Sequence, residues 1–348
     1  MVHAKVRKYA AVCAGAALAS FAIPFVAESP AYAEDAAVAA TTAAPIATIV
    51  KQAGDNPRFP VYLVHSPSMN RDVGLQVIRA ADTSVPRPTL YLLNGAGGGE
   101  DNATWSAQTD LAQFFADKNV NVVIPVGGKF SYYTDWKNDD PVLGRNMWTT
   151  FLTKELPPLV NQTLSTNGEN AIAGISMAGG SALALAESAP GLYKSVGSFS
   201  GCAETSTPIG REYVKMVVET RGHANTDNLW GPVGDPAWVA NDPVVNAEKL
   251  RGTTLYISSG TGIPGVHDTA SDPRFKSGDE LALVNQVVLG GLIESAANGC
   301  TQRLAARLKE LNIPATFDFR KTGSHSWGYW QDDLHNAWPT IAASLGVK

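Results

Sequence analysis

The chain has little cysteine and no excess of positive charge. Three of its 348 residues are cysteines, and 27 lysines and arginines are outnumbered by 32 aspartates and glutamates, which gives a formal net charge of −5. A mildly acidic surface argues against nucleic-acid binding and against a polybasic membrane patch. The sequence also shows no internal repeat, so we do not expect a repeat architecture.

Residues 1–33 are typical of a secretory signal peptide. A basic segment (5–8) precedes an apolar, alanine-rich run (9–26), and Ala-Tyr-Ala at 31–33 is a suitable cleavage site. A lipoprotein signal would use Cys13, but most of the apolar run follows that residue. A retained transmembrane anchor is the other alternative, although the uncharged run is short for a membrane span. We therefore expect a secreted or cell-envelope protein whose mature chain has no transmembrane anchor.

The mature chain is predicted to be one α/β domain. Residues 34–50 are small and low in complexity and predict a flexible, Ala-rich lead-in, and 51–348 form the domain. Strand-like apolar runs alternate with helical patterns, which predicts a mostly parallel eight-stranded sheet with helices on both faces. The first two runs alternate and indicate an antiparallel pair. Turn signals predict an irregular insertion near 202–250. The strand runs are 61–65, 74–80, 89–95, 120–127, 171–176, 195–201, 254–260 and 315–320, and the helical patterns are 109–118, 148–162, 178–189, 280–296, 301–312 and 331–345.

Two cysteines remain once the signal peptide is removed. Cys202 and Cys300 are then the only possible pair in an oxidising exterior, so we predict that they form a disulfide. The alternative is two buried free thiols.

A serine follows the fifth strand run, within GISMAGG at 174–180. An apolar strand that ends in Gly-x-Ser before a helix of small residues is the context of a nucleophile elbow, so Ser176 is a candidate nucleophile. Ala178 stands where the usual Gly-x-Ser-x-Gly pattern has glycine. The motif alone therefore leaves open an ordinary strand-to-helix turn.

A serine nucleophile needs a base and an acid that orients the base. His325 follows the last strand run in a loop with glycine and serine, where an α/β-hydrolase carries its histidine. The acid is expected between Ser176 and His325, and position after a strand favours an aspartate. The candidate acids are Asp268, Asp272, Asp279, Glu280 and Glu294.

An oxyanion hole needs two backbone N–H groups. One is expected from Met177, directly after the serine, and the other from the glycine-rich loop NGAGGGED at 94–101. No Gly-Lys-Ser/Thr follows this loop, which argues against nucleotide binding.

Several stretches together resemble the antigen 85 mycolyltransferases and their corynebacterial relatives, which are secreted α/β-hydrolases. The resemblance runs in order over residues 60–330. The matching stretches are SPSMNRD (66–72), YLLNG (91–95), IPVGG (124–128), YYTDW (132–136), WTTFLTKELP (148–157), GISMAGGSALALA (174–186), WGPVGDPAW with NDP (230–243) and GSHSWGYW (323–330).

The resemblance implies a role for each candidate residue. It implies Ser176 as nucleophile, His325 as base and Glu294 as acid, with Glu280 as the second choice for the acid. It also implies Ala96 and Met177 as the oxyanion amides.

Two further positions concern the sugar site of the family. Trp327 matches a residue that lines this site, although a core aromatic is the alternative. Asn94 is the candidate substrate contact where mycobacterial members carry an aspartate, and Gly97 stands where they carry an arginine. The loss of that Asp-Arg pair puts the acceptor preference in question.

The resemblance also implies an activity. Ser176 would take a mycoloyl group from trehalose monomycolate and pass it to a second hydroxyl, on trehalose monomycolate, arabinogalactan or a protein. No metal or organic cofactor is implied, and the oligomeric state is not predicted. The alternatives are a secreted carboxylesterase and a non-catalytic wall-binding adhesin.

Overall fold

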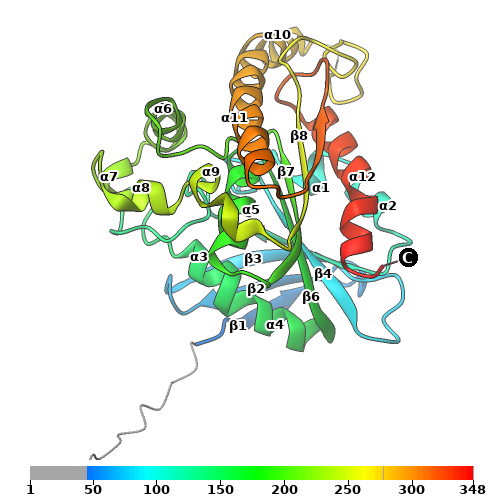
Figure 1. Cartoon of the computed structure of the whole chain (residues 1–348). Helices are drawn as coiled ribbons and strands as arrows, with labels where there is room; N and C mark the ends of the chain where they lie inside the picture. Colours follow the sequence, from blue (N-terminus) through cyan, green and yellow to red (C-terminus); the bar gives the residue numbers. More distant parts are fainter. Residues whose placement is uncertain (1–44, 277, 348) are drawn as a thin grey trace, which may run out of the picture. The chain divides into compact units, whose positions relative to one another are not determined.

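A nine-stranded mixed sheet forms the centre of the domain (Figure 1). The computed structural model describes residues 45–276 and 278–347, so the predicted signal peptide and most of the lead-in lie outside the described residues. The strands are β1 (Thr48–Ala53), β2 (Val61–Ser66), β3 (Arg71–Ile78), β4 (Arg87–Leu93), β5 (Asn121–Val126), β6 (Thr166–Ile175), β7 (Tyr193–Phe199), β8 (Thr254–Ser259) and β9 (Thr316–Phe319). Their order across the sheet is β1-β2-β3-β5-β4-β6-β7-β8-β9.

All eight predicted strands are present, and their directions follow the expected pattern. β2 and β3 pair antiparallel, whereas β4 to β9 are mutually parallel. The ninth strand, β1, pairs antiparallel with β2 and begins at Thr48, inside the range 34–50 that was expected to be a flexible lead-in. All six of its residues are exposed. Because β1 does not alternate between buried apolar and exposed polar residues, the sequence carries no pattern that would reveal it.

Helices cover both faces of the sheet. Successive side chains of a strand point to opposite faces, so the apolar side chains of one strand contribute to two cores. Tyr91 and Leu93 of β4 join one core with α4, α5 and α11, whereas Leu90 and Leu92 join the other core with α2 and α12. The helical segments are α1 (Trp105–Gln108), α2 (Leu111–Phe114), α3 (Trp148–Thr150), η1 (Phe151–Glu155), α4 (Leu156–Leu164), α5 (Met177–Ser188), α6 (Pro208–Lys215), η2 (Met216–Arg221), α7 (Thr226–Trp230), α8 (Pro236–Ala240), α9 (Pro243–Asn246), η3 (Ala247–Leu250), α10 (Glu280–Asn285), η4 (Gln286–Gly290), α11 (Gly291–Glu310) and α12 (Trp327–Ser344).

Three helical predictions needed correction. The pattern at 109–118 is helical only over α2. The patterns at 280–296 and 301–312 belong to one helix, in which the π-helical turn η4 joins α10 to α11. The insertion near 202–250 is a series of short helices rather than an irregular segment.

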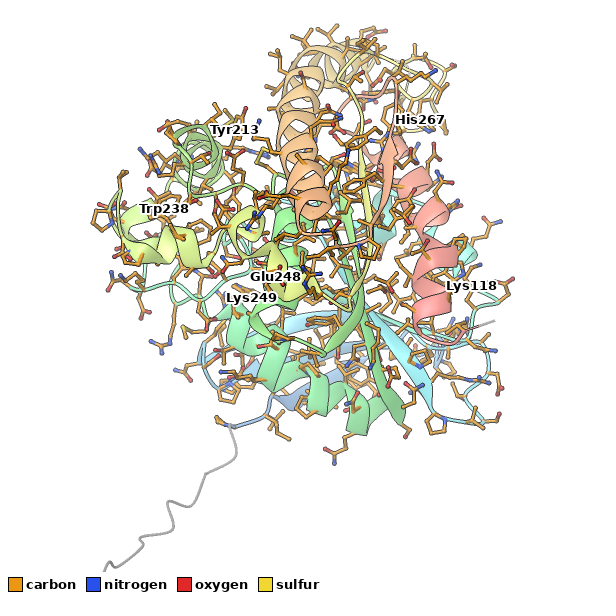
Figure 2. The ribbon with its side chains drawn as sticks, viewed as in Figure 1. Lys118, Tyr213, Trp238, Glu248, Lys249 and His267 are labelled. Carbon is orange, nitrogen blue, oxygen red and sulfur yellow. A yellow bond between two sulfur atoms is a disulfide. The ribbon has the colours of Figure 1, made fainter. Side chains whose placement is uncertain are left out.

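The reason for the last difference lies in the Asp-Pro pairs. Asp235 and Asp242 accept hydrogen bonds from the first turns of α8 and α9, and the following prolines are the first residues of these helices. A capping residue followed by proline starts a helix as readily as it forms a turn. Trp230 and Trp238 lie in the small apolar core of this region, and Trp238 is labelled in Figure 2.

Candidate active site

The serine elbow joins β6 to α5. Ser176 has φ 56° and ψ −125°, a strained backbone for a residue with a side chain. A Cβ on Gly174 would lie 2.5 Å from the carbonyl oxygen of Ala178 and 2.9 Å from its methyl carbon. The methyl of Ala178 therefore fits because position 174 has no side chain, and the departure from the usual glycine does not disturb the turn.

The elbow places Ser176 within reach of the two other candidate residues. Ser176 Oγ lies 2.8 Å from His325 Nε2, and His325 Nδ1 lies 2.8 Å from Glu294 Oε2. For Nε2 to accept the serine proton, Nδ1 must carry the hydrogen and donate it to the carboxylate. The imidazole is then oriented by Glu294 as general-base catalysis requires.

The geometry distinguishes among the candidate acids. Glu280 is exposed at the start of α10, and Glu294 is fully buried against His325. Asp268 accepts hydrogen bonds from Tyr329 and Ser324, so it ties the loop after β8 to the segment beside His325.

A second histidine accounts for Asp272. His267, labelled in Figure 2, bonds Asp272 through Nδ1 at 2.9 Å and Asp332 through Nε2 at 2.7 Å. Asp272 thus has a partner other than His325. Glu294 is the carboxylate that contacts His325.

The other oxygen of Glu294 receives several hydrogen bonds. Its Oε1 accepts from Gly260 N at 2.5 Å, from Ser200 Oγ at 2.8 Å and from Arg320 Nη2 at 3.3 Å. Arg320 also pairs with Asp333, which is fully buried. Burial raises the pKa of Asp333 to about 7, although Arg320 acts to lower it. No sequence motif marks Ser200 and Arg320, which contact Glu294 from distant elements, or Asp333, which contacts Arg320.

The expected oxyanion residues lie beside the serine. Met177 is the first residue of α5, where helix amides have no acceptor within the helix. Ala96 lines the cavity that contains Ser176. Both backbone positions are compatible with the predicted role.

Asn94 does not lie where a substrate contact was expected. Its side chain is fully buried, accepts a hydrogen bond from Trp105 N at 3.1 Å and donates one to Pro125 O at 3.4 Å. A Cβ on Gly99 would lie 2.4 Å from its amide nitrogen, so the glycine-rich loop packs directly over it. Asn94 therefore holds the loop, and the prediction of a direct substrate contact is wrong.

Gly97, at the other departure from the mycobacterial pattern, leaves room for a carboxylate. A Cβ there would lie 2.7 Å from Asp101 Oδ2, and Asp101 lines the cavity near Ser176. Trp327 lines the same cavity and packs edge-on against Trp105 and Trp330. Asp101 is thus a polar cavity residue that no sequence motif indicated.

Two cavities meet at Ser176 and His325. The larger, of about 690 Å³, is lined by a mixture of polar side chains that include Asp101 and Arg221, the aromatic Trp327, and aliphatic side chains such as Leu289. The smaller, of about 300 Å³, is mainly apolar and is lined by residues that include Tyr132, Met177, Val217, Leu292, Ile293 and Ala296. Ser176 therefore faces one mixed and one apolar space.

The predicted disulfide is confirmed. Cys202, in the loop after β7, is bonded to Cys300 of α11 across 98 positions of sequence. The bond ties the helix that carries Glu294 to the loop that carries Ser200. Cys202 also lines the apolar cavity.

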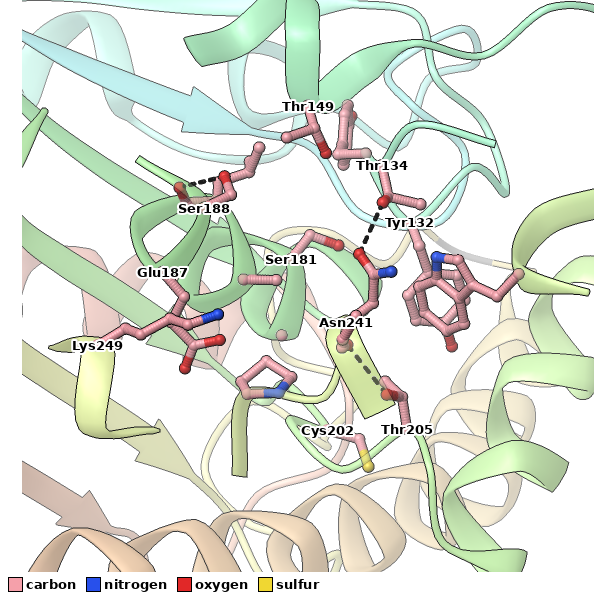
Figure 3. Close-up of a pocket in the computed structure, with 17 residues that line it drawn as sticks. Tyr132, Thr134, Thr149, Ser181, Glu187, Ser188, Cys202, Thr205, Asn241 and Lys249 are labelled. Carbon is pink, nitrogen blue, oxygen red and sulfur yellow. Dashed lines mark hydrogen bonds between the residues drawn. The ribbon is translucent and has the colours of Figure 1, made fainter. Parts of the chain in front are cut away.

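A third cavity, of about 120 Å³, lies beside α5 (Figure 3). Burial raises the pKa of Glu187 in its wall to about 9, and the side chain of Lys249 lies near that carboxyl group. Asn241 accepts a hydrogen bond from Thr134 Oγ1 on the opposite side. Among the described residues that line this cavity, neither Ser176 nor His325 occurs, but Tyr132 and Cys202 line both it and the apolar cavity, so the two cavities adjoin.

Comparison with known proteins places the chain in a family. A family model described as a putative esterase matches residues 66–341. The diacylglycerol acyltransferase/mycolyltransferase Ag85A of Mycobacterium leprae is 33% identical over 307 residues, which cover 85% of this chain and 87% of that protein. The corresponding Ag85B of Mycobacterium avium is 32% identical over 304 residues, with coverages of 84% and 86%. The chain belongs to the antigen 85 mycolyltransferase family.

Solved structures support the same assignment. Mycobacterium tuberculosis MPT51 (FbpC1) is 28% identical, with a TM-score of 0.67 and coverages of 81% of this chain and 97% of that protein. FphF, a fluorophosphonate-binding serine hydrolase of Staphylococcus aureus, has a TM-score of 0.58 at 19% identity, with coverages of 82% and 98%, and shares the fold. Membership of the antigen 85 family and of the esterase family indicates an acyltransferase or esterase function.

Proposed function

We propose that the chain is a secreted, cell-envelope serine acyltransferase that moves a mycoloyl group from trehalose monomycolate to a second hydroxyl. The observation that carries the proposal is the position of Ser176 and His325 at the junction of an apolar cavity and a larger mixed cavity. An acyl chain fits the first, and a sugar headgroup or acceptor fits the second.

The hydrogen-bonded chain supports a two-step reaction. His325 Nε2 takes the proton of Ser176 Oγ as that oxygen attacks the ester carbonyl, and Glu294 stabilises the imidazolium. The tetrahedral oxyanion is stabilised by the amides of Ala96 and Met177. Its collapse breaks the ester bond, and His325 returns the proton to the departing trehalose oxygen.

The second step repeats the first in reverse. An acceptor hydroxyl in the larger cavity gives its proton to His325 and attacks the acyl-serine. The acceptor can be a second trehalose monomycolate, arabinogalactan or a protein. Water as acceptor would make the chain a carboxylesterase with the same machinery.

The test combines intact-mass detection of the acyl-enzyme with product analysis. With trehalose monomycolate, the wild-type protein should gain one acyl group and form dimycolate. Ser176→Ala should do neither, and Ser188→Ala, which alters an exposed serine of α5, should behave as wild type. Release of free acid alone, with acceptor present, would show an esterase. Failure of a fluorophosphonate to label Ser176 would favour a non-catalytic adhesin.

A further inference from the structure

One helix face is apolar and open to solvent near the active site. Residues 281–292 contain no charged side chain, and Leu281, Val284, Val288, Leu289 and Leu292 are between 53% and 72% exposed. We call these five residues the apolar face. An exposed helix face in a soluble protein normally carries polar and charged residues. Figure 1 shows α10 at one end of the domain, beyond the edge of the sheet.

The helix is long, apolar and anchored to the fold. Over Glu280–Glu310 it is long and apolar enough to cross a membrane by length and composition, and only 22% of its most apolar window is buried in the protein. Glu294 and Cys300 of the same helix are held in the fold by His325 and by the disulfide. The apolar face is thus fixed at the surface, where a lipid layer can meet it from one side.

The apolar face continues into the active site. Leu289 and Leu292 are partly exposed and also line the apolar cavity that contains Ser176. Met216, which is 49% exposed, lines both cavities with Leu289. An acyl chain could therefore pass from a lipid layer to Ser176 along apolar side chains. Binding of a protein partner to the apolar face would not require the face to continue into the cavity that contains Ser176.

We propose that the apolar face docks on the surface of a lipid layer, with its side chains among the acyl chains. Helices that bind in this way insert a face of large apolar residues at the boundary between headgroups and acyl chains. The proposal goes beyond the proposed acyl transfer, because docking requires no chemistry at Ser176. Five large apolar residues on one exposed face carry it.

The test is binding of the purified protein to phosphatidylcholine vesicles, measured by co-flotation. In one variant, Leu281, Val284 and Val288, none of which lines a cavity with Ser176, are replaced by serine. We expect at least ~10-fold weaker vesicle binding and unchanged hydrolysis of a soluble short-chain ester. The matched control replaces three other exposed valines, Val233, Val239 and Val245, by serine and should bind as wild type.

Further arms separate the alternatives. Ser176→Ala should bind vesicles as wild type does, so a failure of the acyl-transfer proposal would leave this result unaffected. Equal vesicle binding by the triple variant and wild type, or none by wild type, would overturn the proposal. Dimers of the wild type in sedimentation without lipid, lost in the triple variant, would assign the face to a second copy of the chain.

Discussion

Replacement of Glu294 by glutamine should invert the hydrogen bond to His325. Oε1 of Glu294 accepts hydrogen bonds from Gly260 N, Ser200 Oγ and Arg320 Nη2, so a glutamine must place its oxygen there. Its NH₂ group then faces Nδ1 of His325, 2.8 Å from the present carboxylate oxygen. Nδ1 must accept that hydrogen, and the ring proton moves to Nε2, which can no longer take the proton of Ser176.

The expected loss is large and specific. A wrong histidine tautomer of this kind lowers kcat about 10⁴-fold, equivalent to about 5 kcal/mol in the activation barrier. Hydrolysis of a chromogenic short-chain ester measures kcat and KM, and we expect KM to change little. Glu280→Gln is the matched control, since Glu280 is exposed on the same helix, and should stay within about 2-fold of wild type. An E294Q enzyme within tenfold of wild-type kcat would refute the assignment of Glu294 as the acid.

Three more changes test other parts of the structure. Replacing Cys202 and Cys300 by alanine removes a cross-link over 98 positions and should lower the free energy of unfolding by about 4 to 5 kcal/mol in urea; a loss under about 1 kcal/mol would contradict this. The pKa of Asp333 is about 7 in the folded state against an ordinary value of 3.8, so the folded state holds this proton more tightly. The resulting contribution to the free energy of unfolding is complete below about pH 4 and is lost as the pH rises through 7. Asp333→Asn should flatten the pH dependence of unfolding in this range, and an unchanged slope would argue against that pKa. Gly174→Ala should cost about 1 to 3 kcal/mol and slow fluorophosphonate labelling, because its methyl meets the Ala178 carbonyl, whereas Ala178→Gly should label normally; normal labelling of the Gly174 variant would contradict the packing argument.

The sequence predicted the fold because the sheet is mostly buried. Uniformly apolar runs such as β4, six of whose seven residues are buried, leave a pattern that depends only on local sequence. Two of the features that the sequence did not predict depend on context. β1 is fully exposed and is recognisable only by its pairing with β2, and the Asp-Pro signals were ambiguous between a turn and a helix start.

Part of the candidate site could also be predicted from the sequence. Ser176 and His325 follow strands at the carboxyl edge of the sheet, so topology alone predicts that they meet. The acid could not be chosen this way, because Glu294 approaches from inside a long helix and not from a strand end. Asn94 was misassigned because a motif position does not reveal that its side chain turns inward beneath the loop.

The shape of the long helix explains why Glu294 lies against His325. A straight α-helix turns its side chains by a fixed angle, whereas the π-helical turn η4 inserts an extra residue between α10 and α11 and resets which face points inward. After this turn, Glu294 is buried against His325, while Val288 and Leu289 within the turn and Leu292 after it remain exposed. One helix therefore carries both Glu294 and the whole apolar face. If lipid contact shifts this helix, the change should reach Ser176 through the hydrogen bond between Glu294 and His325, so vesicles should alter kcat for a soluble ester in wild type and not in the triple serine variant.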